Sequence, residues 1–137
     1  MRKYTKSPKK VAIEWIKAAD IKKRLNQLID RLELKWVQKG RIFCYRSYRS
    51  SSRAYARIWG FSRLWQMALN EKPAYIIEVL AEKFDGLSDF EKDKVLLHEL
   101  SHIPKNFSGS LVPHFKRGKR SFDKRTKILI EKYSKER

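Results

Sequence analysis

The sequence predicts an α+β domain with helices near its N- and C-terminal ends, extended segments in its middle and a further helix that bears histidines. Amphipathic patterns with helical spacing occupy both ends of the chain, segments rich in aromatic and β-branched residues fill its middle, and a helix-start signal precedes the histidines. The chain has 137 residues without internal repeat or linker, which is the size of one domain. We therefore expect a single domain over 1–137 with a basic tail over about 1–10.

A first helix is expected over about 12–32. Apolar residues recur there at intervals of three and four with charged residues between them, which is the pattern of an amphipathic helix. These apolar residues are Ile21, Leu25, Leu28, Ile29 and Leu32. Asp20 offers another start, because its carboxylate can accept hydrogen bonds from the N–H groups of a first turn beginning there.

The middle of the chain is expected to be extended. Aromatic and β-branched residues flank Gly40, which predicts a hairpin over 32–48. The arginine- and serine-rich segment 46–57 is expected to be an exposed loop. Residues 58–70 leave two alternatives open: short extended pieces with a bend at Gly60, or the start of a helix.

The best strand candidate is residues 73–84, where Pro73 is tolerated at the start of a strand or on an edge. Tyr75, Ile77 and Val79 would occupy one face, and Ile76, Glu78 and Leu80 the other. Asp85 and Gly86 then predict a turn.

Two further helices are predicted in the C-terminal half. Ser88 followed by Glu91 is a capping-box signature, so a helix should begin there, run through Ile103 and end near Pro104. The last helix is indicated by a stripe of apolar and β-branched residues after Ser121, its candidate cap. The stripe consists of Phe122, Thr126, Leu129, Ile130 and Tyr133.

The chain is strongly basic, with 33 Lys and Arg against 15 Asp and Glu and a formal net charge of +18. Self-repulsion of that size destabilises the folded state unless counterions or an anionic partner neutralise it. Nucleic acid, an acidic protein or a membrane surface are candidate partners, and a solvated lysine-rich surface is the alternative. Arginines and aromatics also interleave over 45–59, which suits phosphate contacts and base stacking, although such aromatics often fill a core.

Cysteine usage and hydropathy predict an intracellular, cytoplasmic protein. The single Cys44 has no partner for an intramolecular disulfide or a cysteine-based zinc site, and is expected to be a buried small apolar residue. Glu14, Lys17 and Asp20 interrupt the apolar run near the N-terminus, so export is not indicated. No window approaches 18 uninterrupted apolar residues, so no membrane span is predicted.

All three histidines lie in one window, HELSHIPKNFSGSLVPH, residues 98–114. His98 and His102 are four residues apart, so on a helix they lie one turn apart on the same face and can converge on one ion. In H-E-x-x-H the two histidines hold zinc, and the glutamate, here Glu99, handles the proton of a zinc-bound water. The window therefore predicts one Zn²⁺ ion with Glu99 as the catalytic residue.

A catalytic zinc site needs a third protein ligand, and His114 is the predicted one. Gly109 permits a backbone turn, and the twelve residues that follow the second histidine can return His114 to the ion. Asp123 or Glu131 from the last helix is the competing ligand. The ordinary alternative for Glu99 is a surface pair with a neighbouring lysine.

At these residues the chain resembles the zincin-like metallopeptidases, and most closely the small predicted metallopeptidases of archaea and their viruses or phages. The similarity rests on HELSHIP, on FSGSLVPH after it and on YIIEVLAEKFDGLS before it. A weaker likeness in ARIWGFSRLWQMAL extends it to about residues 54–116. A more distant similarity is to the SprT-like proteases, which degrade proteins attached to DNA, but this chain lacks their zinc-ribbon cysteines.

The resemblance implies a zincin-like, metallopeptidase-like domain in which a small, twisted, mixed sheet packs on the zinc-binding helix and an edge strand receives substrate in extended form. Tyr75 to Ala81 would supply that strand and the wall of the cleft. The pattern departs from the metzincins, where a glycine and the third histidine follow the second by three and six residues. Here they follow by seven and twelve, so specificity is not transferred from that clan.

Two functions follow from these observations. The first is a zinc-dependent peptidase that acts on peptide or protein substrates, with Glu99 accepting a proton from water and passing it to the leaving amine. The second is a basic, nucleic-acid-associated protein whose metal site is structural or inactive. A SprT-like protease acting on nucleic-acid-bound proteins would combine the two.

Overall fold

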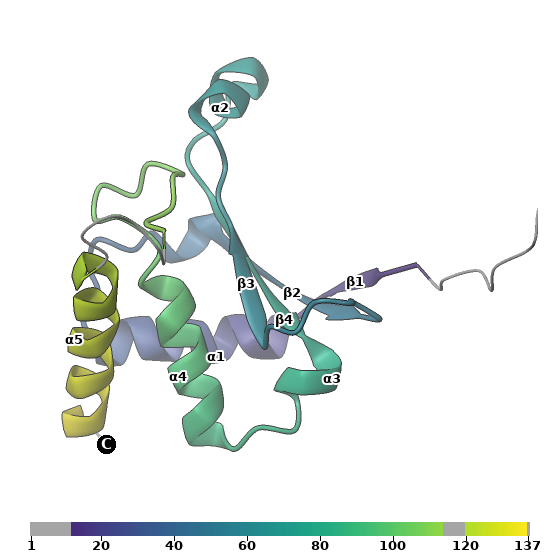
Figure 1. Ribbon diagram of the computed structural model, residues 1–137. Helices are drawn as coiled ribbons and strands as arrows, with labels where there is room; N and C mark the ends of the chain where they lie inside the picture. The colour runs from purple at the N-terminus through teal and green to yellow at the C-terminus, as the bar shows by residue number, and fades with distance from the viewer. Residues whose placement is uncertain (1–11, 114–119, 137) are drawn as a thin grey trace, which may run out of the picture.

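The computed structural model describes residues 12–113 and 120–136 and has a four-stranded mixed sheet at its centre (Figure 1). The strand order is β1-β2-β4-β3, with β2 and β4 parallel and the two outer strands antiparallel to their neighbours. The strands are β1 (Glu14–Lys17), β2 (Ile42–Tyr48), β3 (Ala56–Trp59) and β4 (Tyr75–Leu80). The helices are α1 (Ala19–Arg31), α2 (Arg63–Leu69), α3 (Ala81–Phe84), α4 (Asp89–Leu100) and α5 (Arg120–Glu136), with a 3-10 turn, η1 (Lys39–Arg41). The predicted α+β class is confirmed, while the basic tail over about 1–10 lies outside the described residues.

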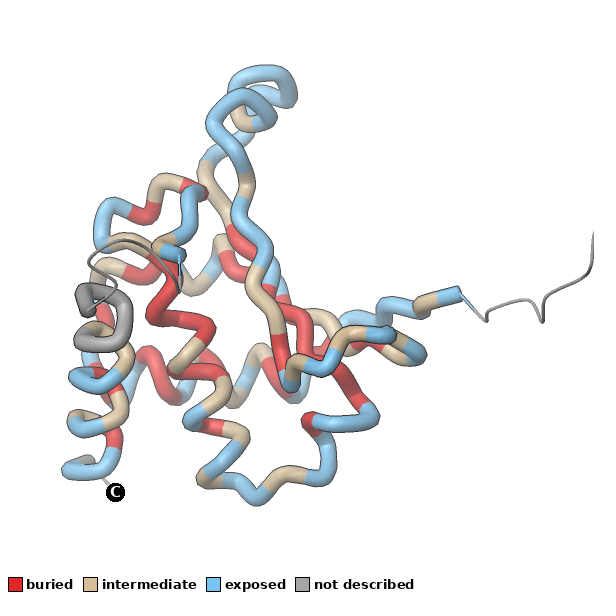
Figure 2. Tube along the Cα trace, viewed as in Figure 1, coloured by how far each residue is buried: buried red, intermediate tan, exposed pale blue. Residues whose placement is uncertain are grey.

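Helices α1 and α4 pack on one face of the sheet, and α5 packs against α4 (Figure 1). The buried stretches of Figure 2 follow this layer, along α1, the inner strands and the second half of α4. All five apolar residues that predicted the first helix are buried, so their spacing identified the core-facing side of α1 correctly. Cys44 is buried on β2, as expected.

The predicted start of the first helix is wrong. Residues 14–17 form the edge strand β1, whose backbone pairs with β2, and α1 begins only at Ala19. The apolar periodicity starts at Ile21, so nothing upstream of that residue anchored a helix to the core. The alternative cap is also wrong, because Ala18 is the N-cap and Asp20 lies within the first turn.

The predicted hairpin over 32–48 is wrong as well. Residues 32–37 form turns that bury Leu32, Leu34 and Val37, and only the second half of the segment becomes a strand. That strand, β2, pairs in parallel with β4 and antiparallel with β1. A parallel pair needs a long crossover connection, which local alternation does not reveal.

The exposed loop predicted over 46–57 is confirmed in its central part. Strand β2 continues to Tyr48 and β3 begins at Ala56, which leaves residues 49–55 as the loop.

Of the two alternatives for residues 58–70, the helix is correct. The Ser62 hydroxyl accepts from the Trp65 N–H at 3.3 Å, which caps α2, and Asn70 ends it with a φ of 53°. Helix α2 buries none of its residues and projects away from the sheet (Figures 1 and 2). We call residues 61–72 the α2 arm.

The strand predicted over 73–84 is divided into β4 and the single turn of α3. Tyr75, Ile77 and Val79 are buried as one face, as predicted. Strand β4 lies between β2 and β3, so both of its edges are paired.

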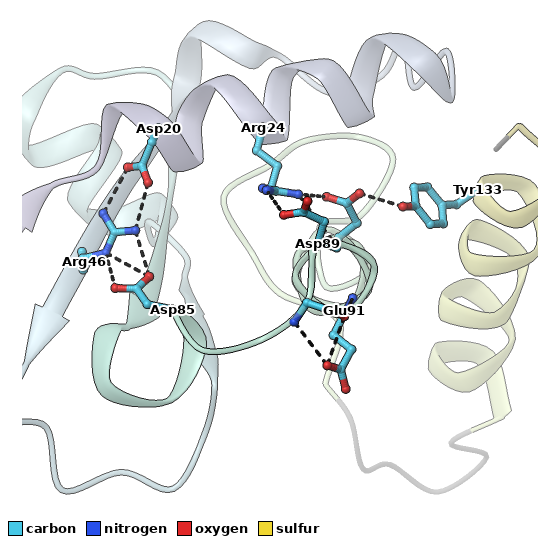
Figure 3. Close-up of polar contacts among 9 residues, drawn as sticks. Asp20, Arg24, Arg46, Asp85, Asp89, Glu91 and Tyr133 are labelled. Carbon is cyan, nitrogen blue, oxygen red and sulfur yellow. Dashed lines mark hydrogen bonds and ion pairs between the residues drawn. The ribbon is translucent and has the colours of Figure 1, made fainter.

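The capping box at the start of α4 is confirmed. The Ser88 hydroxyl accepts from the Glu91 N–H at 3.2 Å, and the Glu91 carboxylate accepts from the Ser88 N–H at 3.3 Å (Figure 3). A cap of this type stabilises a helix by about 1 kcal/mol. It fixes where α4 begins and therefore which residues face the sheet.

The α-helical part of α4 ends at Leu100, three residues earlier than predicted. A tighter turn follows, in which the His102 N–H donates to the Glu99 carbonyl at 3.1 Å. Arg125 of α5 donates to the carbonyls of Ser101 and Ile103, where the chain leaves the helix. The end of α4 is thus satisfied from a different helix.

The predicted last helix is confirmed as α5, with Leu129 and Tyr133 buried. The side chains of Ser121 and Phe122 lie outside the described residues. Within the described ranges, no helix combines the length and the apolar content needed to cross a bilayer.

Asp93, which is buried on α4, joins three helices (Figure 3). Arg24 of α1 donates to one of its oxygens at 2.8 Å, and the Tyr133 hydroxyl of α5 donates to the other at 2.7 Å. A buried carboxylate is stable only when hydrogen-bonded, so this contact fixes α4 relative to α1 and α5.

Candidate metal centre

His98 and His102 lie beside each other at the C-terminal end of α4. Their ring centroids are 5.3 Å apart and the ring planes are inclined by 82°. His98 is half-buried, His102 is 5% exposed and Glu99 is 7% exposed, and all three line the same cavity. The structure therefore brings together the three residues of the H-E-x-x-H motif, although His102 lies in the turn after the α-helix proper.

The orientation of the His102 ring is fixed by Val112. The Nδ1 atom lies 2.6 Å from the Val112 carbonyl oxygen, and the Val112 N–H donates to the His102 carbonyl at 2.7 Å. A carbonyl oxygen only accepts, so Nδ1 carries the proton and Nε2 retains its lone pair. Metal-binding histidines are held in this way by a carbonyl or carboxylate behind the ring, so His102 fits a metal ligand.

The segment that carries Val112 is anchored by Tyr75. Its hydroxyl accepts from the Gly109 N–H at 2.8 Å and donates to the Ser110 carbonyl at 2.8 Å. The Tyr75 ring also packs edge-to-face on Phe107 at 4.9 Å. Burial raises the pKa of Tyr75, so the hydroxyl stays protonated and keeps both hydrogen bonds at neutral pH.

The same segment crosses the base of the α2 arm at two glycines. The Phe61 N–H donates to the Gly109 carbonyl at 2.8 Å, and the Gln66 amide donates to the carbonyls of Phe61 (2.7 Å) and Ser108 (2.9 Å). A Cβ on Gly60 would lie 2.5 Å from the Gly109 oxygen, and Gly109 has a φ of +95°. Both positions therefore require glycine, one for close approach and one also for its backbone conformation.

Glu99 is largely buried at the wall of the cavity. Burial raises the pKa of Glu99 to about 8. A divalent cation beside such a carboxyl favours the ionised form. The position next to two imidazoles therefore suits a group that exchanges a proton beside a metal.

The cavity at this site has a volume of about 870 Å³ and lies between β3 and α4. Its remaining walls come from residues 111–113 and from Ile130 of α5. Helix α4 packs directly on β3, the strand nearest to it in Figure 1. The histidines and Glu99 thus open into a cleft with an extended strand along one side.

The edge strand of this cleft is β3, and the expectation that Tyr75 to Ala81 would supply it is wrong. Those residues form β4 and the start of α3, and β4 is covered on its cleft side by β3. The Leu80 N–H donates to the Tyr55 carbonyl at 2.9 Å, and antiparallel pairs alternate. The N–H and C=O groups of Ala56 and Ile58 therefore point away from β4, towards the open edge of the sheet.

The predicted third ligand, His114, lies outside the described residues, as does the side chain of Asp123. Glu131 is exposed on α5. Across residues 12–113 and the described part of α5, no three His, Cys, Asp or Glu side chains are grouped so that they could hold a metal ion. The described part of the site thus supplies two imidazoles and one carboxylate.

Several residues that shape the site were not predicted from the sequence. They are the carbonyl of Val112, the hydroxyl of Tyr75, the amide of Gln66 and the guanidinium of Arg125. Gly109 was the only signal, since a glycine shortly after the motif indicated an unusual turn. Each of the other contacts joins separate segments of the sequence, so it depends on how the chain folds back towards the site.

Comparison with known proteins identifies one family. A family model described as "Putative phage metallopeptidase" matches residues 13–127. No curated protein and no solved structure matches the chain.

Proposed function

The chain belongs to the family described as putative phage metallopeptidases, and we propose that it is a zinc-dependent peptidase whose catalytic residue is Glu99. The observation that carries this proposal is the hydrogen bond from His102 Nδ1 to the Val112 carbonyl oxygen. That bond leaves Nε2 as a metal donor in the cavity that also contains His98 and Glu99.

We assign His98, His102 and His114 as the three zinc ligands. Two of these imidazoles already face one cavity, and the chain reaches His114 two residues after Val112, which is held against His102. Three histidines and an open fourth position are a ligand set of catalytic zinc sites. When bound, zinc supplies Lewis acidity, which polarises a carbonyl oxygen and makes water more acidic.

Glu99 accepts the proton of the attacking water and delivers it to the nitrogen of the leaving amine. Both transfers need a carboxyl within reach of the reacting groups, and Glu99 lines the same cavity as His98 and His102. Glu99 is only 7% exposed, and burial strengthens its electrostatic interactions. The proton taken from water thus ends on the amine product, and Glu99 returns to its starting state.

The substrate lies along β3 in an extended conformation. The backbone groups of Ala56 and Ile58 point towards the cleft, and hydrogen bonds to them would add the peptide to the sheet as a further strand. The cleft walls at Val95, Leu111 and Ile130 are aliphatic, so apolar substrate side chains are expected next to the cleaved bond.

The decisive experiment is Glu99→Gln with an unfolded protein such as casein as substrate. The amide fills the same volume but accepts no proton, so we expect zinc to stay bound and cleavage to stop. Glu33→Gln, which changes an exposed glutamate in the turn after α1, is the matched control and should cleave at the wild-type rate. Unchanged cleavage by the Glu99 variant would remove this residue from the mechanism.

The ligand assignment is tested by elemental analysis of the wild type and of His114→Ala. Loss of stoichiometric zinc from the variant supports His114 as the third ligand. Zinc retained at wild-type stoichiometry would contradict the assignment and direct the search to Asp123 or Glu131.

A further inference from the structure

The sheet face opposite α1 and α4 carries aromatic side chains. Residues paired across strands share a face, so the register places Phe43, Ile76 and Trp59 in one row across β2, β4 and β3. The next row runs from β1 to β3 and consists of Lys17, Tyr45, Glu78 and Arg57. Trp15 lies in the row beyond.

These rings are not part of the core. Trp15 is 55% exposed, Trp59 48% and Phe43 39%, whereas Ile42, Cys44 and Ala56 on the inner face of β2 and β3 are buried. Soluble proteins seldom expose several large aromatic side chains on one surface unless that surface binds something.

The face is also hollowed. One hollow of about 240 Å³ is lined by Trp15, Tyr45, Trp59, Ile76 and Glu78. A second, of about 290 Å³, is lined by Phe43, Gly60 and Phe61 among others, and it shares Trp59 and Ile76 with the first. Two sites for flat apolar groups therefore lie next to each other on the two sides of Trp59.

Arginine–carboxylate ion pairs and one exposed lysine lie around these rings. The Arg57 guanidinium lies 5.3 Å from the centre of the Trp59 ring, and it pairs with Glu78 at 3.2 Å. The Trp59 indole N–H donates to the same carboxylate at 2.9 Å, which fixes the ring on the sheet. Glu78 is therefore neutralised beneath the surface, and the exposed cation Lys17 lies in the same row.

A second arginine, Arg41, lies beside the Phe43 ring in the same way. The Arg41 guanidinium lies 6.0 Å from the centre of the Phe43 ring and pairs with Glu71 at 3.4 Å. The acidic groups of this part of the face are thus compensated by arginines, within a chain whose net charge is +18.

We propose that this sheet face binds single-stranded nucleic acid, with bases stacked on Trp59, Phe43 and Trp15 and phosphates beside the lysine and arginine side chains. Exposed aromatics interleaved with cations on a strand surface are what a single strand requires, because every base offers a flat face and every nucleotide a charge. A duplex buries those faces in its own stack, so it cannot use the rings.

The nucleic-acid face and the peptidase cleft lie on different sides of the molecule. Trp59 alternates along β3 with Ile58 and does not line the peptidase cleft, whereas Arg57 borders both surfaces. Bases on Trp59, Phe43 and Trp15 would therefore lie outside the cleft, and the nucleic-acid proposal does not depend on peptidase activity.

The test is fluorescence anisotropy of the full-length chain with a labelled oligothymidylate of about 12 nucleotides, a length within the usual site size. The double variant Trp15→Ala/Phe43→Ala removes two rings without changing charge. Each lost ring should weaken binding by about five- to 150-fold, while the dependence on salt stays that of the wild type. Trp65→Ala/Leu64→Ala on α2 removes the same kinds of exposed apolar side chain elsewhere and should bind like the wild type.

A second variant tests the charge contribution. Lys17→Gln should make the log–log salt dependence shallower by about 0.7, the value for one phosphate contact on a single strand. Circular dichroism and thermal unfolding confirm that each variant is folded. Equal affinity of the wild type and the ring-deficient variant would mean that net charge alone attracts the oligonucleotide, and would overturn the proposal. So would wild-type self-association that the same double variant abolishes, because a second copy would then occupy the face.

Discussion

The clearest prediction concerns Tyr75, whose hydroxyl anchors the segment that orients His102. The substitution Tyr75→Phe removes one oxygen and leaves the ring, with its edge-to-face contact on Phe107, in place. Two hydrogen bonds of 2.8 Å are lost, one from the Gly109 N–H and one to the Ser110 carbonyl.

The two losses differ in size. Ser110 is exposed, so its carbonyl regains a hydrogen bond from water, whereas Gly109 is buried and its N–H is left without a partner. An unsatisfied buried donor costs about 1–3 kcal/mol of folding free energy. For a chain of this length, that corresponds to a decrease in Tm of roughly 3–10 °C.

The change should also reach the metal centre, since Gly109 and Ser110 precede Val112, which holds the His102 ring. Loss of such support behind a metal ligand typically weakens metal binding by about 10- to 100-fold. Urea unfolding followed by tryptophan fluorescence measures the stability, and competition with a chromogenic chelator under fully folded conditions measures the zinc affinity.

Tyr45→Phe is the control, because the Tyr45 ring lines a hollow on the opposite sheet face. Its stability should stay within about 0.5 kcal/mol of the wild type. If Tyr75→Phe were equally harmless in both measurements, the hydroxyl would not anchor the segment and the reasoning that connects it to His102 would be refuted.

Two further predictions concern stability and reactivity at other positions. Burial raises the pKa of Cys44 to about 11, so its thiol should react with a disulfide reagent at pH 8 far more slowly in the native chain than in urea; equal rates would show that the thiol is accessible. The hydrogen bond from Arg46 lowers the pKa of Asp20, so this pair stabilises the fold above the ordinary carboxyl pKa and the contribution is lost as the pH falls through the lowered value. Arg46→Met, which also removes the ion pair with Asp85, should therefore lower the unfolding free energy by about 1 kcal/mol at pH 7 and by less in acid. Urea unfolding of both chains at the two pH values measures this difference. A loss of stability that does not change with pH would contradict the assignment.

The elements that were predicted correctly carry their own signals. The capping box at Ser88 is satisfied within one turn, and the spacing from Ile21 to Leu32 marks the buried side of α1. Strand β1 was missed because all four of its residues are exposed and only its pairing with β2 makes it a strand. Strand β3 was missed as the edge of the cleft because its position depends on which strand β4 pairs with.

The same distinction holds at the site. His98, Glu99 and His102 could be predicted together because their relation is local, within five consecutive residues at the end of α4. The partner that selects the tautomer of His102 is a backbone carbonyl, and any residue type offers the same atom. Which residue supplies this carbonyl depends on where the chain passes His102 after the motif, and no pattern of side chains in the sequence indicates that path.

The crossing of Gly60 and Gly109 has a consequence for anyone who alters the α2 arm. The two backbones touch without room for a methyl group, and the Gln66 amide donates to a carbonyl of each. A shortened arm that keeps residues 60–66 in place would keep these contacts. A graft of this metal centre onto another scaffold would have to carry both glycines, because the segment that they position holds the His102 ring.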